Sequence, residues 1–322
     1  MKDGSERRAL LKRARRLVVK VGSAVLTDRR GALNFRQVHH LADQVCALLA
    51  KGKEVIVVTS AAISAGIGEL GLRRRPTTMP ALQAAAAVGQ SRLIRTYSEA
   101  FRRHGVGVGQ VLLSREDMED RARFLNTRNT LRALVAMGCV PVINENDSVC
   151  VEEIRYGDND FLAAHLATAM MADLVVLLTT VDGLLGADGR SVVPVVERVS
   201  EEVLGLDDGG RSTVGTGGMA SKLQAARMMT RAGVAVVVAN GRRRNVLERI
   251  AAGEEVGTLF LPAARPMAPG LPAPLYWLTR VVPAWPRPIA RAMPTKTMFM
   301  VMVGATSAVL PNLPSQKASI RL

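Results

Sequence analysis

Short runs dominated by Val, Ile and Leu, with helix-like stretches between them, constrain this chain more than any other feature of its sequence. Six such runs recur, over residues 17–21, 54–60, 108–114, 140–144, 174–180 and 234–240. Their aliphatic residues are continuous rather than alternating with polar ones, which is typical of strands covered on both faces. Between the first two runs, apolar residues recur at the spacing of one helix face: Val38, Leu41, Val45, Leu48 and Leu49. The pattern predicts an α/β protein with a central, mostly parallel sheet flanked by helices.

Small and polar residues collect directly after these runs, where a parallel sheet binds its ligands, beyond the carboxyl ends of the strands. The groups are Lys20–Ser23, Thr59–Gly66, Asn144–Asp147, Gly157–Asp160, Val181–Gly183 and Gly215–Lys222. The last group opens a helical stretch, so its glycines let backbone N–H groups approach an anion at a helix N-terminus. Lys20 lies within a strand, where a charge is costly unless it has a partner. The conjunction favours a phosphoryl group held by Lys20 and Lys222, although each feature alone also fits a turn, a cap or an edge-strand charge.

The net charge of +15 is concentrated at the two ends of the chain. Residues 1–30 carry a net +7, residues 256–322 carry +7 without any Asp or Glu, and the body between them carries +1. Aromatic residues make up only 3% of the chain, so platforms for stacking nucleic-acid bases are not expected. A neutral body with basic ends argues against nucleic acid as a partner.

Cysteine content and apolar runs indicate the class of protein. Three cysteines without CxxC spacing exclude a disulfide scaffold and disfavour structural zinc. The four histidines form no ligand pair with Cys or Asp, so no metal ligands are predicted in the chain itself. Lys20 interrupts the first apolar run, so there is no signal-peptide core, and the late apolar run 298–310 is shorter than the ~20 residues that span a bilayer. We expect a soluble, cytoplasmic protein with no membrane contact.

Familiar nucleotide and nucleophile motifs do not apply. The stretch GIGELG at 66–71 has the spacing of a dinucleotide-binding motif, but it begins several residues after its strand. Neither a P-loop nor a G-x-S-x-G elbow occurs in the chain. These observations exclude the most common classes of nucleotide-binding and hydrolytic site.

The composition changes sharply near residue 263. Ten of the 15 prolines and both tryptophans lie in 264–322, and such proline-rich stretches continue neither a helix nor a sheet. We predict a basic N-terminal extension at 1–14, one α/β domain at 15–263, and a Pro-rich, acid-free tail at 264–322 that is not an independently folded domain. A frameshift and natural divergence would both produce such a tail.

Long stretches of the chain resemble the glutamate 5-kinases of the amino-acid kinase family. The resemblance covers roughly residues 15–263, and MEDRARFLN and INEND within it are specific to this branch of the family. The matching stretches are VVKVGSAVLT (18–27), VTSAAISAG (58–66), AAVGQSRLI (86–94), MEDRARFLN (118–126), VPVINENDSV (140–149), GDNDFLAA (157–164), GTGGMASKLQAA (215–226) and VGTLFLP (256–262).

This resemblance implies ATP-dependent phosphorylation of the side-chain carboxylate of L-glutamate to L-glutamyl 5-phosphate, the first step of proline biosynthesis. It implies a homo-oligomer, with Mg²⁺ accompanying ATP. By matching motifs, Lys20 and Lys222 would act on the phosphoryl group, Asp160 would position them, and the residues binding glutamate would be Ser60, Asp147 and Asn159. The nucleotide-binding residues would be Lys20, Thr179, Thr180, Thr216, Gly217, Gly218, Met219, Ala220, Ser221 and Lys222. Because a glutamate carboxylate is already ionised at neutral pH, the chemistry asks for positioning and charge neutralisation rather than a general base.

The chain also departs from the family pattern. Ala61 stands where the family usually has glycine, Thr180 where it usually has aspartate, and Ser221 where it usually has threonine. Many members continue into a small PUA domain, which residues 264–322 do not resemble. These departures leave open a catalytically impaired, ligand-binding pseudokinase. Another carboxylate or carbamate kinase of the same fold and, in a different class, an RNA-binding protein using the basic ends are further alternatives.

Overall fold

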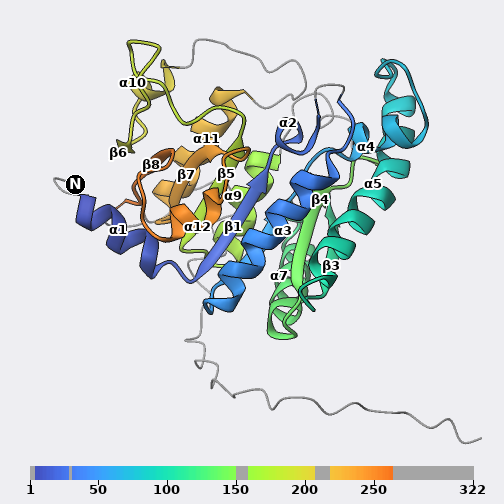
Figure 1. Ribbon diagram of the computed structural model, residues 1–322, viewed down its shortest axis with the longest axis horizontal. Helices are drawn as coiled ribbons and strands as arrows, with labels where there is room; N and C mark the ends of the chain where they lie inside the picture. The colour runs from blue at the N-terminus through green and yellow to red at the C-terminus, as the bar shows by residue number, and fades with distance from the viewer. Residues whose placement is uncertain (1–3, 29–30, 150–158, 207–217, 264–322) are drawn as a thin grey trace, which may run out of the picture. The chain divides into compact units, whose positions relative to one another are not determined.

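An eight-stranded sheet forms the centre of the computed structural model, which describes residues 4–28, 31–149, 159–206 and 218–263 (Figure 1). The strand order is β3-β4-β2-β1-β5-β7-β8-β6. The strands are β1 (Arg16–Val21), β2 (Glu54–Val58), β3 (Val108–Leu113), β4 (Val140–Glu145), β5 (Leu174–Thr179), β6 (Val195–Val196), β7 (Ala235–Asn240) and β8 (Thr258–Phe260). Every neighbouring pair is parallel except β7 with β8. The predicted α/β fold with a mostly parallel central sheet is confirmed.

Six of these strands coincide with the six aliphatic runs, and two do not. Strands β6 and β8 have only two and three residues, which is too short to stand out as a run in the sequence. Both lie at the end of the sheet order, where β8 pairs antiparallel with β7 and parallel with β6.

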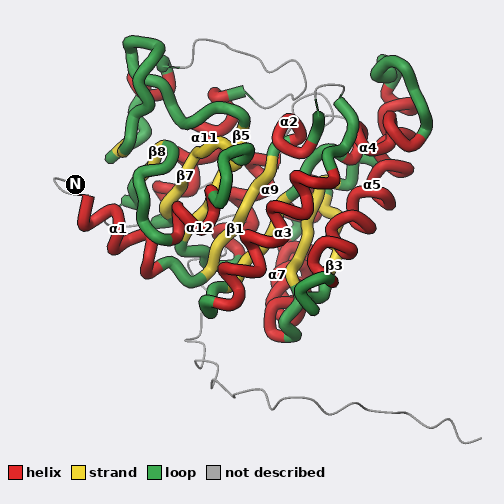
Figure 2. The backbone as a smooth tube through the Cα atoms, viewed as in Figure 1, coloured by secondary structure: helices red, strands yellow, loops and turns green. Residues whose placement is uncertain are grey.

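Helices cover both faces of the sheet (Figure 2). The first face is covered by α1 (Gly4–Arg13), α2 (Ser23–Leu26), α3 (Phe35–Ala50), α4 (Ala62–Glu69), α5 (Met79–Arg102) and α12 (Val246–Ala251). The second face is covered by α6 (Arg115–Glu119), α7 (Arg121–Ala136), α9 (Asn159–Ala169) and α11 (Met219–Arg231), and the short helix α10 (Glu201–Leu204) lies beside α11. None of the helices in the described ranges is long and apolar enough to cross a bilayer.

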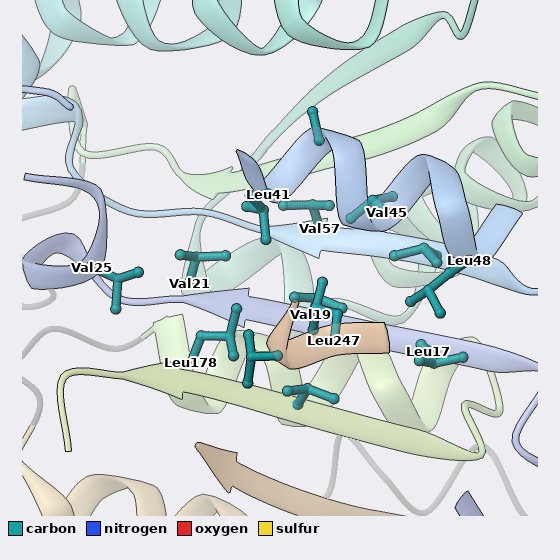
Figure 3. Close-up of a cluster of buried hydrophobic side chains, with 14 of the residues drawn as sticks. Leu17, Val19, Val21, Val25, Leu41, Val45, Leu48, Val57, Leu178 and Leu247 are labelled. Atoms are coloured by element: carbon teal, nitrogen blue, oxygen red, sulfur yellow. The ribbon is translucent and has the colours of Figure 1, made fainter. Parts of the chain in front are cut away.

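Side-chain alternation along the strands divides the apolar residues into two cores. In β1, Leu17, Val19 and Val21 belong to the core on the α3 side, which Figure 3 shows packed against residues of α3 and α12. Val18, between them, belongs to the core on the α9 side. Successive side chains of a strand point to opposite faces, so Lys20 shares the face of Val18. This parity directs the lysine toward α9 and α11.

Helix α3 follows its sequence signals closely. The Asn34 side chain accepts a hydrogen bond from the backbone N–H of Gln37 and so caps the helix at its start. The helix ends before Gly52, whose φ of 74° lies in the left-handed region that favours glycine. Its expected apolar face is buried, with Leu49 only partly so.

The first helix, α1, packs on the rest of the described chain. Its Leu11 and Arg7 are buried, at 0% and 1% exposed. The Arg7 guanidinium donates to the backbone oxygens of Pro194, at 2.7 Å, and Val256, at 3.0 Å. Residues 4–13 of the basic extension thus contribute to the folded core. The tail at 264–322 lies outside the described residues.

Candidate functional site

Three buried charged side chains from β1, α9 and α11 meet at the carboxyl edge of the sheet. Lys20 Nζ lies 2.5 Å from Asp160 Oδ1, and Lys222 Nζ lies 3.1 Å from Asp160 Oδ2. Asp160 is fully buried, and each lysine is 4% exposed. Helix α9 packs against both β1 and α11, the other two elements that carry them (Figure 1). Lys20, Asp160 and Lys222 are called the phosphoryl cluster below.

The electrostatics of the phosphoryl cluster favour an ionised carboxylate and an incoming anion. Burial by itself raises the pKa of Asp160, but the charges of Lys20 and Lys222 outweigh it and hold that pKa well below its usual 3.8. Two ammonium groups face one carboxylate, so the three groups together carry one net positive charge. A buried positive charge of this kind stabilises the negative charge of a phosphoryl group in a site from which water is excluded.

The start of α11 completes this side of the site. Ser221 Oγ donates to Asp160 Oδ2 at 2.9 Å, and Lys222 Nζ donates to the Gly218 oxygen at 3.2 Å. The backbone N–H groups of a first helical turn have no partner within the helix and point toward its N-terminus, where they can bind an anion. Of the nucleotide-binding residues predicted here, Gly218 to Lys222 occupy this turn, whereas Thr216 and Gly217 lie outside the described residues.

A chain of neutral side chains lies beside the phosphoryl cluster. Asn159 Nδ2 donates to Ser60 Oγ at 2.9 Å and to Asn144 Oδ1 at 3.2 Å. Asn144 Nδ2 in turn donates to Gln90 Oε1 at 2.9 Å. Gln90, Asn144, Asn159 and Ser60 are called the amide chain below. It links α5, β4, α9 and the end of β2, and Asn159 directly precedes Asp160 of the phosphoryl cluster.

The turn between Ser60 and α4 has an unusual backbone. Ala61 has φ 79° and ψ 16°, in the left-handed region, and is 8% exposed. An L-residue with a side chain pays about 1–2 kcal/mol to adopt this conformation, and glycine does not. The geometry gives a physical reason for a glycine at this position and shows that the alanine of this chain is strained.

The other predicted site residues lie at the ends of β4 and β5, which β2 and β1 separate in the sheet. Asp147 is half-buried in the turn that follows β4. Thr179 ends β5, and Thr180 follows it, both half-buried. All three lie at the carboxyl edge of the sheet, as the phosphoryl cluster does.

An ion pair also lies next to the two threonines. Arg243 contacts Asp182 through two nitrogens, at 2.9 and 2.6 Å, and Asn240 Nδ2 donates to Asp182 Oδ1 at 3.0 Å. Asn240 pairs with Thr179 across β7 and β5. The acidic side chain of this strand end is thus at position 182, two residues after Thr180.

Sequence reasoning missed two members of the amide chain. Asn144 carried a usable signal, because it is a polar residue at the end of an aliphatic run, and it is 1% exposed. Gln90 lies within the matching stretch 86–94, but its residue type gave no sign of a site role, because a lone glutamine within a long helix is normally a solvent-facing residue. Its contact with Asn144 joins residues 54 positions apart and depends on how α5 packs.

Metal ligands are scarce in the described part of the chain. Among those residues, no group of three or more His, Cys, Asp or Glu side chains is placed to hold a metal ion. The carboxylate at the centre of the phosphoryl cluster already has an ammonium partner at each oxygen.

Comparison with known proteins gives consistent matches over most of the chain. Residues 15–240 match the amino acid kinase family. The glutamate 5-kinase of Pelobacter propionicus is 46% identical over 261 residues, which cover 80% of this chain and 70% of the relative. The glutamate 5-kinase of Moorella thermoacetica is 48% identical over 266 residues, covering 80% and 69%. The similarity thus extends through every element that carries the phosphoryl cluster and the amide chain.

A solved structure supports the fold independently of close sequence similarity. The crystal structure of UMP kinase from Bacillus anthracis superposes with a TM-score of 0.51 at 17% identity, covering 78% of this chain and 97% of that one. At this identity the likeness concerns the fold alone.

Proposed function

This chain belongs to the amino acid kinase family, and on that premise we propose that its site is that of a glutamate 5-kinase. The enzyme transfers the terminal phosphoryl group of ATP to the side-chain carboxylate of L-glutamate, giving L-glutamyl 5-phosphate and ADP, in the first step of proline biosynthesis. The observation that carries the proposal is the phosphoryl cluster, a buried pair of lysines around one carboxylate at the start of a glycine-led helix. It lies within a chain that is 46–48% identical to glutamate 5-kinases.

The chemistry requires little more than position and charge. The acceptor carboxylate is ionised at neutral pH, so it attacks the phosphorus without losing a proton, and the bond from phosphorus to the leaving oxygen of ADP breaks. Lys20 and Lys222 lie on either side of Asp160, which keeps both ammonium groups in place in a buried setting. We propose that the two ammonium groups stabilise the negative charge that develops on the transferring phosphoryl group. Asp160 acts as a positioning residue because both of its oxygens are held by the lysines.

Glutamate binding is assigned to residues beside the phosphoryl cluster. We assign the substrate to Ser60, which follows β2, to Asp147, which follows β4, and to Asn159, which begins α9. Asp147 would pair with the α-ammonium group, the single cationic group of the substrate. Ser60 Oγ accepts from Asn159, so its hydroxyl proton is available to donate to a substrate carboxylate.

Nucleotide binding is assigned to the residues at the end of β5 and at the start of α11. Thr179, Thr180 and the segment Thr216–Lys222 would hold ATP, with the first turn of α11 facing its phosphates. Mg²⁺ would be held mainly by the phosphates of ATP and by water, which suits a described chain without a metal-ligand cluster, and it would lower the charge of those phosphates. We further propose that the enzyme works in the cytoplasm, as a homo-oligomer.

The alternative of an impaired pseudokinase rested on Ala61, Thr180 and the foreign tail. The ion pairs of the phosphoryl cluster and the hydrogen bond from Ser221 to Asp160 are formed in this chain, which carries Ala61 and Thr180. The tail is assigned no part in the reaction. We expect that truncation after Ala263 keeps turnover with ATP and glutamate within about twofold of the full chain, and a truncated protein that folds but loses turnover would contradict this.

A direct assay tests the function. Purified protein is incubated with ATP, Mg²⁺, glutamate and hydroxylamine, which converts an acyl phosphate into a coloured hydroxamate. We expect hydroxamate only when ATP and glutamate are both present. Aspartate and carbamate replace glutamate as control acceptors. Turnover with a control acceptor but not with glutamate would assign the chain to another kinase of this fold, and no turnover with any acceptor would favour the pseudokinase.

A further inference from the structure

Helix α5 makes two polar contacts with the residues around the glutamate side of the site. Gln90 accepts from Asn144, and seven residues later the Tyr97 hydroxyl lies 2.9 Å from Thr59 Oγ1. A spacing of seven residues places both side chains on one face of a helix. Thr59 directly precedes Ser60. Helix α5 thus contacts the site at the ends of both β4 and β2.

Close helix packing fixes α5 in this position. A Cβ atom on Gly89 would lie 1.8 Å from the Ala62 oxygen, and one on Gly66 would lie 1.7 Å from the Ala85 oxygen. The backbones of α4 and α5 therefore touch at these two glycines, where no other residue fits. Gly89 is next to Gln90, and Ala62 is the first residue of α4, two positions after Ser60. The crossing thus holds Gln90 in a fixed relation to the start of α4.

The amide chain has a direction, and Gln90 stands at its origin. Because Gln90 Oε1 accepts from Asn144 Nδ2, Asn144 turns its oxygen toward Asn159. Asn159 then uses Nδ2 for both Asn144 and Ser60, and turns its own oxygen away. Reversing the Gln90 amide would reverse each following amide in turn.

The amide chain ends in a hydrogen-bond acceptor that lacks a donor among the described residues. Asn159 Oδ1 is buried and has no hydrogen-bond partner among the residues that the structure describes. A buried acceptor without a donor costs about 1–3 kcal/mol, so the position calls for a donor from a ligand. The N–H donors of glutamate are those of its α-ammonium group.

We infer that Gln90 is a positioning residue for glutamate: by setting the direction of the amide chain, it makes Asn159 present an oxygen to the substrate ammonium. This inference rests on the proposed function, and it adds a residue on α5 that touches neither substrate nor nucleotide. It also makes the affinity for glutamate depend on the crossing of α4 and α5.

The test compares two substitutions of Gln90. Gln90→Met keeps the length of the side chain and removes the acceptor, whereas Gln90→Glu keeps an acceptor for Asn144 Nδ2. We expect Gln90→Met to raise the KM for glutamate about tenfold, as the loss of one buried hydrogen bond would, and to leave the KM for ATP within twofold. Gln90→Glu is expected to stay near the wild type. A KM for glutamate that is unchanged in Gln90→Met, or raised equally in both variants, overturns the inference.

Two further measurements separate positioning from a general effect on the helix. Gln83→Met is the matched control, because Gln83 is also half-buried on α5 but lies seven residues earlier, about 10 Å along the axis. It should leave both KM values within twofold. In an Asn144→Ala background, Gln90→Met should have no additional effect, since Gln90 acts through Asn144; additive effects would contradict this.

The wild type distinguishes failure of the inference from failure of the proposed function. Glutamate-induced stabilisation, measured as a shift in Tm, follows binding without turnover. A wild type that forms hydroxamate while Gln90→Met keeps its KM defeats only the role of Gln90. A wild type that neither forms hydroxamate nor is stabilised by glutamate defeats the function, and the role of Gln90 with it.

Discussion

The phosphoryl cluster and the amide chain meet at consecutive residues, Asp160 and Asn159, yet they are built on different principles. The cluster consists of charges that pair with one another and leave one positive charge in excess. The amide chain is neutral, and its contacts are directional hydrogen bonds that end in one acceptor without a donor among the residues that the structure describes.

Under the proposed function, the two groups of residues have different tasks on either side of the start of α9. A preorganised charge stabilises the transition state, where negative charge shifts during transfer, and therefore acts on kcat. The ammonium end of the substrate does not change during the reaction. Neutral groups that bind it through directional hydrogen bonds therefore act on KM. Each prediction below separates these tasks.

Removing a lysine of the phosphoryl cluster should have the largest effect. Lys222→Ala is expected to lower kcat by about 10²–10³, because one preorganised group that faces the developing charge is lost. Circular dichroism checks that the variant is folded. Lys51→Ala, at an exposed lysine after α3, is the matched control and should keep full turnover. Activity of Lys222→Ala within a few-fold of the wild type would show that this lysine does not act on the phosphoryl group.

Asp147→Ala should affect the binding of glutamate rather than phosphoryl transfer. If Asp147 pairs with the substrate ammonium, losing that charge-assisted contact costs about 1.5–3 kcal/mol, or roughly a 10- to 150-fold rise in the KM for glutamate. The KM for ATP should change far less. Steady-state kinetics with each substrate varied in turn provides the measurement, and equal increases in both KM values would instead indicate a structural role.

Acid should weaken the phosphoryl cluster and leave the neutral amides unaffected. Because the folded-state pKa of Asp160 lies below its unfolded value, its contribution to stability is present above about pH 4 and is lost as the pH falls further. Each unit of that pKa difference corresponds to about 1.4 kcal/mol. Denaturant unfolding of the wild type and Asp160→Asn should therefore give free energies that converge below pH 4. Burial also lowers the pKa of His165, whose contribution declines from about pH 6.5 downward and is thus separable.

The smallest effect is expected at the strained turn next to Ser60. Ala61→Gly relieves the left-handed strain, which offsets the lost methyl burial and the greater freedom of glycine in the unfolded chain. Ala62→Gly, the adjacent helical position, gains no such relief and should lose about 1 kcal/mol of unfolding free energy. We expect Ala61→Gly to be the more stable variant by about 1 kcal/mol or more in urea unfolding. The opposite order would mean that the strain at Ala61 is not energetically important.

Much of the fold could be predicted because its signals are local. Six aliphatic runs became six strands, and the apolar face of α3 was evident from its spacing. Strands β6 and β8 were missed because pairs and triplets of residues form strands only when a neighbouring strand offers hydrogen bonds. The α1 segment was expected from its charge to be an extension, but burial of its Leu11 and Arg7 depends on surfaces contributed by residues near 194 and 256.

The sequence by itself determined which residue types stand at the strand ends, and the parity of β1 already directs Lys20 to one face of the sheet. Only the tertiary structure decided their partners. Asp160 contacts two lysines that are 140 residues before it and 62 residues after it. Gln90 contacts Asn144 because α4 and α5 pack closely at two glycines. The physical reason is that propensity and periodicity act over a few residues, whereas charge pairing and hydrogen-bond direction depend on distances of about 3 Å between groups that only packing brings together.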